Sequence, residues 1–270
     1  ICCMEFTLGP TAFWRHSPIG AGRMDSELDE ATRNTLKRIV YTQRRAVRQE
    51  IEGRESSIGV YSLNGTAFLV NGKSDGSAID DGGTQVMGGL LGALLHPAEL
   101  KHALVVGLGT GSTAGWLAEL PNIERVDVVE LEPGIRDFAA LCAPVNRDVL
   151  HHPKVNLIIA DAREVLLTTP HKYDLIFSEP SNPYRAGVAS LFTKEFYEAV
   201  NARLKPEGVF VQWLQAYEID TFSVQTVYTT LHAVFDSVES WRTKLEDLLL
   251  ISRHEAAPLD LDLLRQRVKQ

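Results

Sequence analysis

An apolar stretch that runs directly into three closely spaced glycines constrains this chain more than any other feature. Residues 103–106, Ala-Leu-Val-Val, lead into Gly107-Leu-Gly-Thr-Gly111, and a segment of helical character follows from Thr113 to Leu120. Glycine permits positive φ angles and close approach of a ligand to the backbone, and the new helix offers unpaired N–H groups at its start. Such a turn is typical of nucleotide and nucleoside sites, although in many proteins its glycines serve packing alone.

A second apolar strand, Arg125–Glu130, ends in an acid about 20 residues after the turn. At that position a carboxylate can accept hydrogen bonds from the two hydroxyls of a ribose. The turn and the acid together predict a nucleoside-cofactor site formed by Gly107, Gly109, Thr110, Gly111 and Glu130. The alternative role for Glu130 is to accept hydrogen bonds from N–H groups at the start of the next helix.

Strand and helix patterns alternate from Lys101 onward, which predicts a mostly parallel sheet with helices on both faces. The strand patterns cover 103–107, 125–130, 155–160, 173–178 and 207–213, and the helix patterns cover 112–120, 134–142, 193–204 and 220–233. Two further β-like runs, 235–241 and 248–251, predict a closing hairpin at an edge of the sheet.

The N-terminal part follows other patterns. Residues 1–25 have no steady period, and 26–52 predict a charged amphipathic helix. Alternating residues on both sides of Asn64-Gly65 predict a β-hairpin, and a helix is expected over 84–95. We therefore expect four parts: a lead segment with a helix (1–54), a small β unit (55–82), a nucleoside-binding catalytic domain (83–254) and a truncated tail (255–270).

The chain has 270 residues and a formal net charge of −8. The negative charge argues against a nucleic-acid partner and suits a cationic substrate, although an ordinary acidic protein has the same balance. The three cysteines have neither metal-ligand nor disulfide spacing, so we expect no metal. No stretch is long enough to span a bilayer. The chain begins at Ile1, which suggests a fragment of a longer protein.

The carboxyl ends of parallel strands meet at one edge of a sheet, where ligands bind. Asp161-Ala162 follows the third strand, where the carboxylate can contact an adenine amino group or cap the next helix. Ser178-Glu179 ends the fourth strand, where Glu179 is a candidate general base or an ordinary loop acid. The segment Tyr184–Ser190 is a candidate lid or a plain connection.

In these motifs the chain resembles the spermidine synthase family, the polyamine aminopropyltransferases, from about Glu55 to Ser252. The resemblance rests on the hairpin unit, the glycine turn, Glu130, Asp161-Ala162, Tyr173-Asp-Leu-Ile176 and Ser190-Leu-Phe192. Three segments further resemble the synthase-like domain of bacterial fusions with a transporter-like membrane region: Gly9–Ser17, Val70–Gly76 and Ser178–Pro183. The resemblance implies a Rossmann-like class I methyltransferase fold of seven strands with a small N-terminal β domain.

The resemblance also implies an activity: transfer of an aminopropyl group from decarboxylated S-adenosylmethionine to a small-molecule amine, with release of methylthioadenosine. Glu179 then corresponds to the catalytic Asp, and Asn182 to a second, amine-binding Asp. Asp75 replaces a cofactor-contacting Gln and is an alternative base. The expected cofactor contacts are completed by Gln85, Leu131, Ala162 and Ser178.

Thr110 replaces an acid that in the family holds the aminopropyl end of the donor, and a neutral residue there admits intact S-adenosylmethionine. A methyltransferase or lyase-type enzyme using that donor is therefore the alternative activity. A further alternative is a nucleoside sensor that regulates an attached transporter. The fusion resemblance predicts attachment to a transmembrane region, with this domain on the cytoplasmic side, and a second copy of the chain is a candidate partner in a homodimer.

Overall fold

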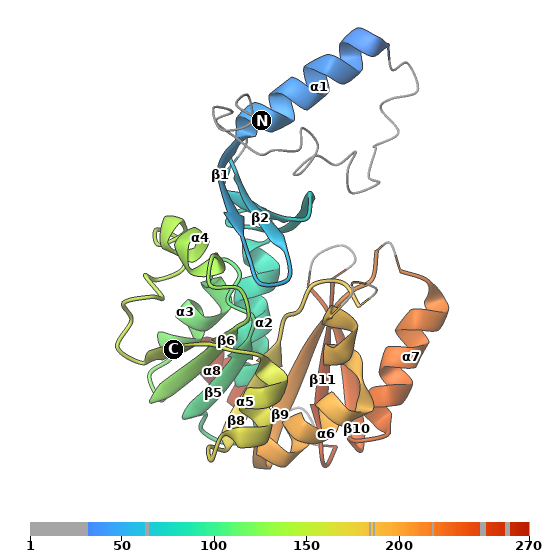
Figure 1. Ribbon diagram of the computed structural model, residues 1–270. Coiled ribbons are helices and arrows are strands. Elements are labelled where there is room, and N and C mark those ends of the chain that lie inside the picture. The colour runs from blue at the N-terminus through green and yellow to red at the C-terminus, as the bar shows by residue number, and fades with distance from the viewer. Residues whose placement is uncertain are drawn as a thin grey trace.

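In the computed structural model, two β-sheets and the helices around them form the molecule (Figure 1). The structure describes residues 32–62, 65–183, 185, 187–217, 219–243, 247–256 and 260–269. The Gly9–Ser17 motif and the lead segment 1–25 lie outside the described residues, as do Tyr184 and Ala186 of the expected lid.

The larger sheet has seven strands. In sheet order they are β10 (Ser237–Arg242), β11 (Asp247–Arg253), β9 (Leu204–Gln215), β8 (Tyr173–Ser178), β5 (His102–Val106), β6 (Arg125–Glu130) and β7 (Val155–Ile159). The five strands from β9 to β7 are parallel, while β10 and β11 form an antiparallel hairpin at the edge. This arrangement confirms the predicted mostly parallel sheet and its closing hairpin.

Apolar residues on the sheet alternate between two cores. On β5, Ala103 and Val105 pack into one core, while Leu104 and Val106 pack into the other. The first core is covered by α2 (Gly82–Leu94), α3 (Ser112–Ala118) and α4 (Ile135–Leu141), and the second by α5 (Ala162–Thr168), α6 (Lys194–Arg203) and α7 (Thr221–His232). Burial on both faces explains why these strands read as continuous apolar runs in the sequence.

The smaller sheet is antiparallel, with the order β1 (Val47–Glu52), β2 (Ser57–Tyr61), β3 (Ala67–Val70) and β4 (Lys73–Ser77). Pairing of β2 with β3 confirms the hairpin. The expected helix over 26–52 is wrong in its last part, since α1 covers only Arg33–Ala46 and 47–52 form an edge strand. Glu50 and Ile51 there pair with residues of β2, so tertiary pairing overrides the helical pattern.

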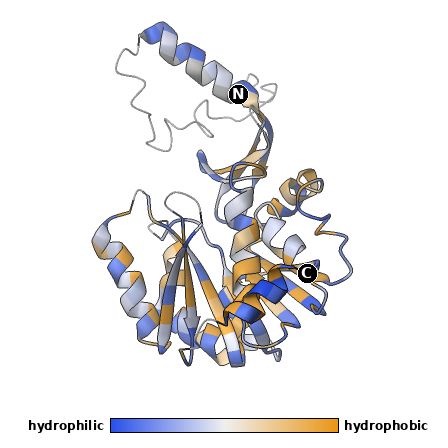
Figure 2. Cartoon of the chain, turned by 180° about the vertical axis from the view of Figure 1, so that it is seen from behind, coloured by the Kyte–Doolittle hydropathy of each residue, from blue (hydrophilic) through white to orange (hydrophobic). Residues whose placement is uncertain are grey.

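The smaller sheet packs on the larger domain through apolar contacts. Ile58, Val60 and Phe68 belong to the first core, and the ring of Phe68 lies 4.8 Å from that of Phe138 on α4. In Figure 2 the strands of the large sheet are mainly hydrophobic, whereas α1 carries hydrophilic residues. None of the helices in the described part of the chain combines the length and the apolar character needed to cross a bilayer.

The C-terminal segment forms a helix that contacts the main domain. This helix, α8 (Leu261–Val268), is capped by Asp260, whose side chain accepts hydrogen bonds from two backbone N–H groups. The guanidinium of Arg267 donates to backbone carbonyls of Ala93, Leu94, His96 and Ala98 at the end of α2. These bonds attach α8 to the end of α2 and to the segment that follows it.

Gly115 on α3 tests how tightly this helix packs beneath the pocket. A Cβ atom there would lie 1.9 Å from the carbonyl oxygen of Asn146, and backbone cannot yield as a side chain can. We expect Gly115→Ala to lower the free energy of unfolding by about 1–3 kcal/mol, as overpacking does. Gly83→Ala on α2 is the matched control, because nothing lies within 4 Å of the added Cβ. Urea denaturation of both variants that showed equal stability would contradict the packing described here.

Candidate functional site

A pocket of about 310 Å³ opens at the carboxyl ends of the parallel strands, beneath the smaller sheet. The strand order reverses between the neighbouring strands β5 and β8. From β5 the next strand in the chain, β6, lies on one side, and from β8 the next strand, β9, lies on the other. Ligands of open α/β sheets bind at such a switch point. The pocket is lined by residues that follow β5, β6, β7 and β8 and by residues of β3 and β4.

The glycine turn approaches the loop after β8 closely. Gly107 has a φ of 99° and Gly109 a φ of 50°, which are left-handed values that favour glycine. A Cβ atom on Gly107 would lie 3.0 Å from the carbonyl oxygen of Glu179. The glycine therefore brings the turn and the Glu179 loop side by side, and both line the pocket.

Glu130 is buried at the end of β6 and connects two turns. One carboxylate oxygen accepts a hydrogen bond from the N–H of Leu108 at 2.8 Å, and the other accepts from the N–H of Glu132, also at 2.8 Å. Burial raises the pKa of Glu130, while these hydrogen bonds oppose the rise. A carboxylate offers about four acceptor sites, so Glu130 can hold the turns and still receive two hydroxyl groups.

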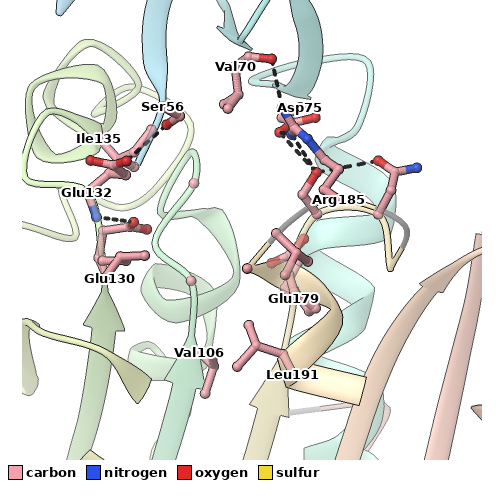
Figure 3. Close-up of a pocket in the computed structure, with 18 of the residues that line it drawn as sticks. Ser56, Val70, Asp75, Val106, Glu130, Glu132, Ile135, Glu179, Arg185 and Leu191 are labelled. Atoms are coloured by element: carbon pink, nitrogen blue, oxygen red, sulfur yellow. Dashed lines mark hydrogen bonds and ion pairs between the residues drawn. The ribbon is translucent and has the colours of Figure 1, made fainter. Parts of the chain in front are cut away.

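Glu132 ties the same loop to the smaller sheet. Its carboxylate accepts hydrogen bonds from the N–H groups of Arg54 and Glu55 and from the hydroxyl of Ser56, at 2.5, 2.8 and 3.0 Å. In Figure 3 Glu130 and Glu132 lie on one side of the pocket, and Ser56 approaches from the smaller sheet. The turn between β1 and β2 thus becomes part of the pocket wall.

Asp161 caps α5, because its side chain accepts from the N–H of Arg163 at 2.8 Å. The hydrogen-bonded Arg163 guanidinium lowers the pKa of Asp161, which keeps this carboxyl ionised. Asp161 and Ala162 also line the pocket, as does Leu131. The capping role is therefore observed, and the contact with adenine stays a prediction.

Glu179 lies at the end of β8, with one oxygen accepting from the hydroxyl of Thr113 at 2.8 Å. Burial raises the pKa of Glu179 to about 7, and the carboxylates of Asp81 and Asp247 add to the rise while the Thr113 hydroxyl opposes it. At neutral pH this carboxyl group can both accept and release a proton, which is the property of an efficient general base.

Opposite Glu130 and Glu132 in Figure 3, a charged cluster lies above Glu179. The carboxylate of Asp75 pairs with the guanidinium of Arg185, and its other oxygen lies 3.3 Å from the ammonium of Lys73. Asn182 is buried and accepts a hydrogen bond from Lys73. The carboxylate expected at Asp75 is therefore neutralised by two side chains of the protein.

Gln85 and Thr110 meet at the wall of the pocket. The Thr110 hydroxyl donates to the side-chain oxygen of Gln85 at 2.5 Å, and both residues are buried and line the pocket. Thr113 donates to the backbone carbonyl of Gln85 at 3.0 Å or to Glu179. The glycine turn, α2 and the Glu179 loop are thus joined by two threonines.

Two expected cofactor contacts do not line the pocket. Gly111 is the N-cap of α3 and packs behind the turn, where a Cβ atom would lie 2.5 Å from Val149. Ser178 is fully buried, as expected for the last residue of a central strand, and does not reach the pocket surface. A residue that is close to a motif in the sequence can therefore either line the pocket or support the residues that line it.

Five side chains with a part in the site were not singled out in the sequence. They are Lys73, Asp81, Thr113, Arg185 and Asp247. Lys73 and Arg185 lie in segments noted for other reasons, and Thr113 lies one residue into the helix that follows the turn. Among the described residues, no group of three His, Cys, Asp or Glu side chains could hold a metal ion.

Comparison with known proteins agrees with this geometry. Residues 85–245 match the family model described as the spermine/spermidine synthase domain. The chain is 30% identical over 152 residues to thermospermine synthase ACAULIS5 of Arabidopsis thaliana, covering 54% of this chain and 44% of the plant protein. It is 35% identical over 127 residues to the polyamine aminopropyltransferase of Nitrosomonas europaea, covering 47% and 38% of the two chains.

Among solved structures, a spermidine synthase in complex with the transition-state analogue AdoDATO superposes with a TM-score of 0.75 at 19% identity, covering 83% of this chain and 80% of that one. This likeness shows that the fold is shared, and it confirms the Rossmann-like architecture expected from the sequence. The matched segments span less than half the length of the two curated relatives. Because the family model matches more than half of this chain, the chain belongs to the spermine/spermidine synthase family.

Proposed function

We propose that this chain transfers an aminopropyl group from decarboxylated S-adenosylmethionine to a small-molecule amine and releases methylthioadenosine. The observation that carries the proposal is the carboxyl group of Glu179, which lies in the pocket with a pKa raised to about 7. It adjoins a glycine turn and a buried acid suited to a nucleoside. The names of the curated relatives, polyamine aminopropyltransferase and thermospermine synthase, agree with this activity.

The difficult step of this reaction is preparation of the nucleophile. The amine attacks the carbon beside a sulfonium, the carbon–sulfur bond breaks, and the leaving group is a neutral thioether that needs no acid. An alkylammonium with the pKa of Lys is only about 0.04% neutral at pH 7, which corresponds to roughly 4–5 kcal/mol. Glu179 orients the ammonium and accepts its proton, and positioning aligns the nitrogen with the breaking bond.

The charges around Glu179 favour the decarboxylated donor. Asp81 and Asp247 lie close enough to raise the pKa of Glu179, and both line the pocket. The carboxylate of intact S-adenosylmethionine would face these acids, and like charges at close range are unfavourable. A methyltransferase or lyase-type reaction with the intact donor is therefore the less favoured alternative, in spite of the neutral Thr110.

The proposed contacts with the donor follow the pocket wall. Gly107, Gly109 and Thr110 face the donor at the turn, together with Gln85. Glu130 and Leu131 face the ribose, and Asp161 and Ala162 face the adenine. Each of these residues lines the pocket. The catalytic domain proposed for 83–254 holds all of them, and the small β unit proposed for 55–82 covers the acceptor side.

We also propose that the chain is attached to a transmembrane region, on the cytoplasmic side, where S-adenosyl compounds are made. Support comes from the resemblance of Gly9–Ser17 and Ser178–Pro183 to transporter fusions. The lead segment and helix proposed for 1–54, of which 47–52 form a strand of the smaller sheet, would join the two regions, and the tail proposed for 255–270 would follow the catalytic domain. A homodimer of this domain is compatible with the proposal.

Replacement of Glu130 by Gln tests the nucleoside end of the pocket. The amide keeps one acceptor oxygen and loses the charge, so the bonds to the turns and to the ribose both weaken. We expect methylthioadenosine to bind roughly ten- to a hundredfold more weakly, since a hydrogen bond to a charged group contributes about 1.5–3 kcal/mol. Glu207→Gln, a change at an exposed position near the start of β9, is the control. Equal affinities of parent and Glu130→Gln by titration calorimetry would refute the assignment.

Replacement of Glu179 by Gln tests the base. We expect single-turnover product formation to fall by about 10²–10⁴, with little change in nucleoside affinity. In the parent, kcat/KM should decrease below pH 7, because a pKa raised to about 7 leaves Glu179 protonated there. In the variant, the rate should instead follow the neutral fraction of the amine and rise tenfold per pH unit.

Three results of the Glu179 experiment would contradict the proposal. A variant that reacts at the parent rate would make Glu179 a structural acid. A parent protein that binds the donor but forms no product with any of the amines tested would favour the sensor. Methylated products formed from intact S-adenosylmethionine would favour the methyltransferase.

Membrane attachment is tested with the full-length gene product in its native host. We expect it to sediment with membranes and to resist extraction by high salt, because a transmembrane region is held by apolar burial rather than by charge. Recovery of the native protein in the supernatant after lysis would contradict the attachment.

A further inference from the structure

The acceptor side of the pocket contains an ammonium group that belongs to the protein. Lys73, on β4, is buried, with its side chain 10% exposed. Its ammonium donates to the side-chain oxygens of Asn182 and Gln215, the latter at 3.4 Å, and lies 3.3 Å from a carboxylate oxygen of Asp75. The contacts with Asn182 and Gln215 are hydrogen bonds, and the contact with Asp75 is an ion pair.

These oxygens belong to buried side chains that are fixed in place. Asn182 is fully buried and Gln215 is 1% exposed. The Asn182 amide donates to the side-chain oxygen of Gln215, and the Gln215 amide donates to the carbonyl of Tyr217 at 2.8 Å. The oxygens of Asn182, Gln215 and Asp75, here called the cradle, therefore form a preformed site for one alkylammonium group. The ammonium of Lys73 occupies this site.

The charge of the surrounding cluster excludes a second ammonium. Asp75 is the carboxylate that pairs with Lys73, and it also pairs with Arg185, whose guanidinium donates to Ser181 at 2.8 Å and to the carbonyl of Val70 at 2.9 Å. Lys73, Asp75 and Arg185 together carry two positive charges and one negative charge. A substrate cation placed directly beside these three groups would meet a local net positive charge, in a pocket whose other charged residues are mainly acidic.

This cluster lies within reach of an acceptor bound at Glu179. Asn182 follows Glu179 by three residues, and three residues span at most about 11 Å of extended chain. Lys73, Asp75, Glu179, Asn182 and Arg185 all line the pocket. An acceptor that directs its reacting nitrogen to Glu179 and extends toward β4 brings its far end to Lys73.

Resting on the proposed aminopropyl transfer, we propose that Lys73 is a built-in ammonium that selects acceptors with a single positive charge. The acceptor is an amine whose far end is neutral or carries a carboxylate. An α,ω-diamine with two ammonium groups is disfavoured, because its far ammonium finds the cradle filled and the cluster positive.

The test compares three acceptors of equal chain length: butylamine, 4-aminobutyrate and 1,4-diaminobutane. With decarboxylated S-adenosylmethionine as donor, release of methylthioadenosine gives kcat/KM for each. We expect the parent to use butylamine or 4-aminobutyrate at least about tenfold better than the diamine, the scale of one unfavourable charge contact. A parent that prefers the diamine overturns the proposal without any variant being needed.

Lys73→Met removes the ammonium and retains an unbranched apolar side chain. We expect the ratio of diamine to butylamine kcat/KM to rise by about 10–100-fold, since the cradle oxygens become available and a positive charge is lost. The double variant Lys73→Met/Asn182→Asp adds a carboxylate and should raise the ratio further. A ratio unchanged in both variants overturns the proposal.

Lys205→Met is the matched control. Lys205 also pairs with a carboxylate, that of Asp174 at 2.9 Å, but it lies at the start of β9, at the opposite end of the sheet from the pocket. Its acceptor ratio should equal that of the parent. Thermal unfolding of each variant shows whether it is folded. If no amine yields methylthioadenosine in the parent or the variants, both the proposed transfer and the acceptor assignment are wrong. A preference of the parent for the diamine would instead contradict the acceptor assignment alone.

Discussion

Two carboxylates, on Glu130 and Glu132, hold together the chain segments that enclose the nucleoside end of the pocket. Glu130 accepts hydrogen bonds from the glycine turn and from its own following loop, and Glu132 accepts from the turn between β1 and β2. Hydrogen bonds to a charged acceptor are stronger than neutral ones. The smaller sheet is therefore positioned over the strand ends by polar contacts on one side and by the Phe68–Phe138 contact on the other.

The other end of the pocket depends on side-chain charge rather than on backbone turns. Desolvation and two nearby acids raise the pKa of Glu179 toward neutrality, whereas Asp75 is held between two cations. The two carboxyl groups have different environments and hence different uses. Separation of acidic groups in this way is how one site assigns one acid to proton transfer and another to structure.

The sequence was sufficient to predict the parallel sheet, the closing hairpin and the strand ends at which the pocket opens. These features depend on local patterns: apolar runs buried on both faces, and polar residues at strand ends that must converge. The charged pattern of 47–52 predicted a helix. The segment is a strand instead, because it pairs with Ser57–Tyr61. Gly111 and Ser178 adjoin residues that line the pocket, but Gly111 packs against Val149 and Ser178 is fully buried in the sheet.

The pairing of Asp75 and Asn182 with Lys73 and Arg185 could not be predicted from the sequence for a different reason. Lys73 and Asn182 are separated by 109 residues, and Asp75 and Arg185 by 110. No local pattern encodes such pairs, since each residue alone resembles an ordinary loop or edge-strand residue. Only the packing of the smaller sheet over the Glu179 loop brings them together.

The nucleoside end and the acceptor end of the pocket differ in how freely their residues can change. The nucleoside end requires glycine geometry and buried carboxylates that also hold the backbone, so substitution there disturbs the architecture itself. The acceptor end is formed by side chains that extend from β4 and the Glu179 loop, and a change of charge at Lys73 or Asn182 leaves the turns intact. Donor binding and proton transfer can therefore be retained while the acceptor changes, which is how one fold serves different substrates.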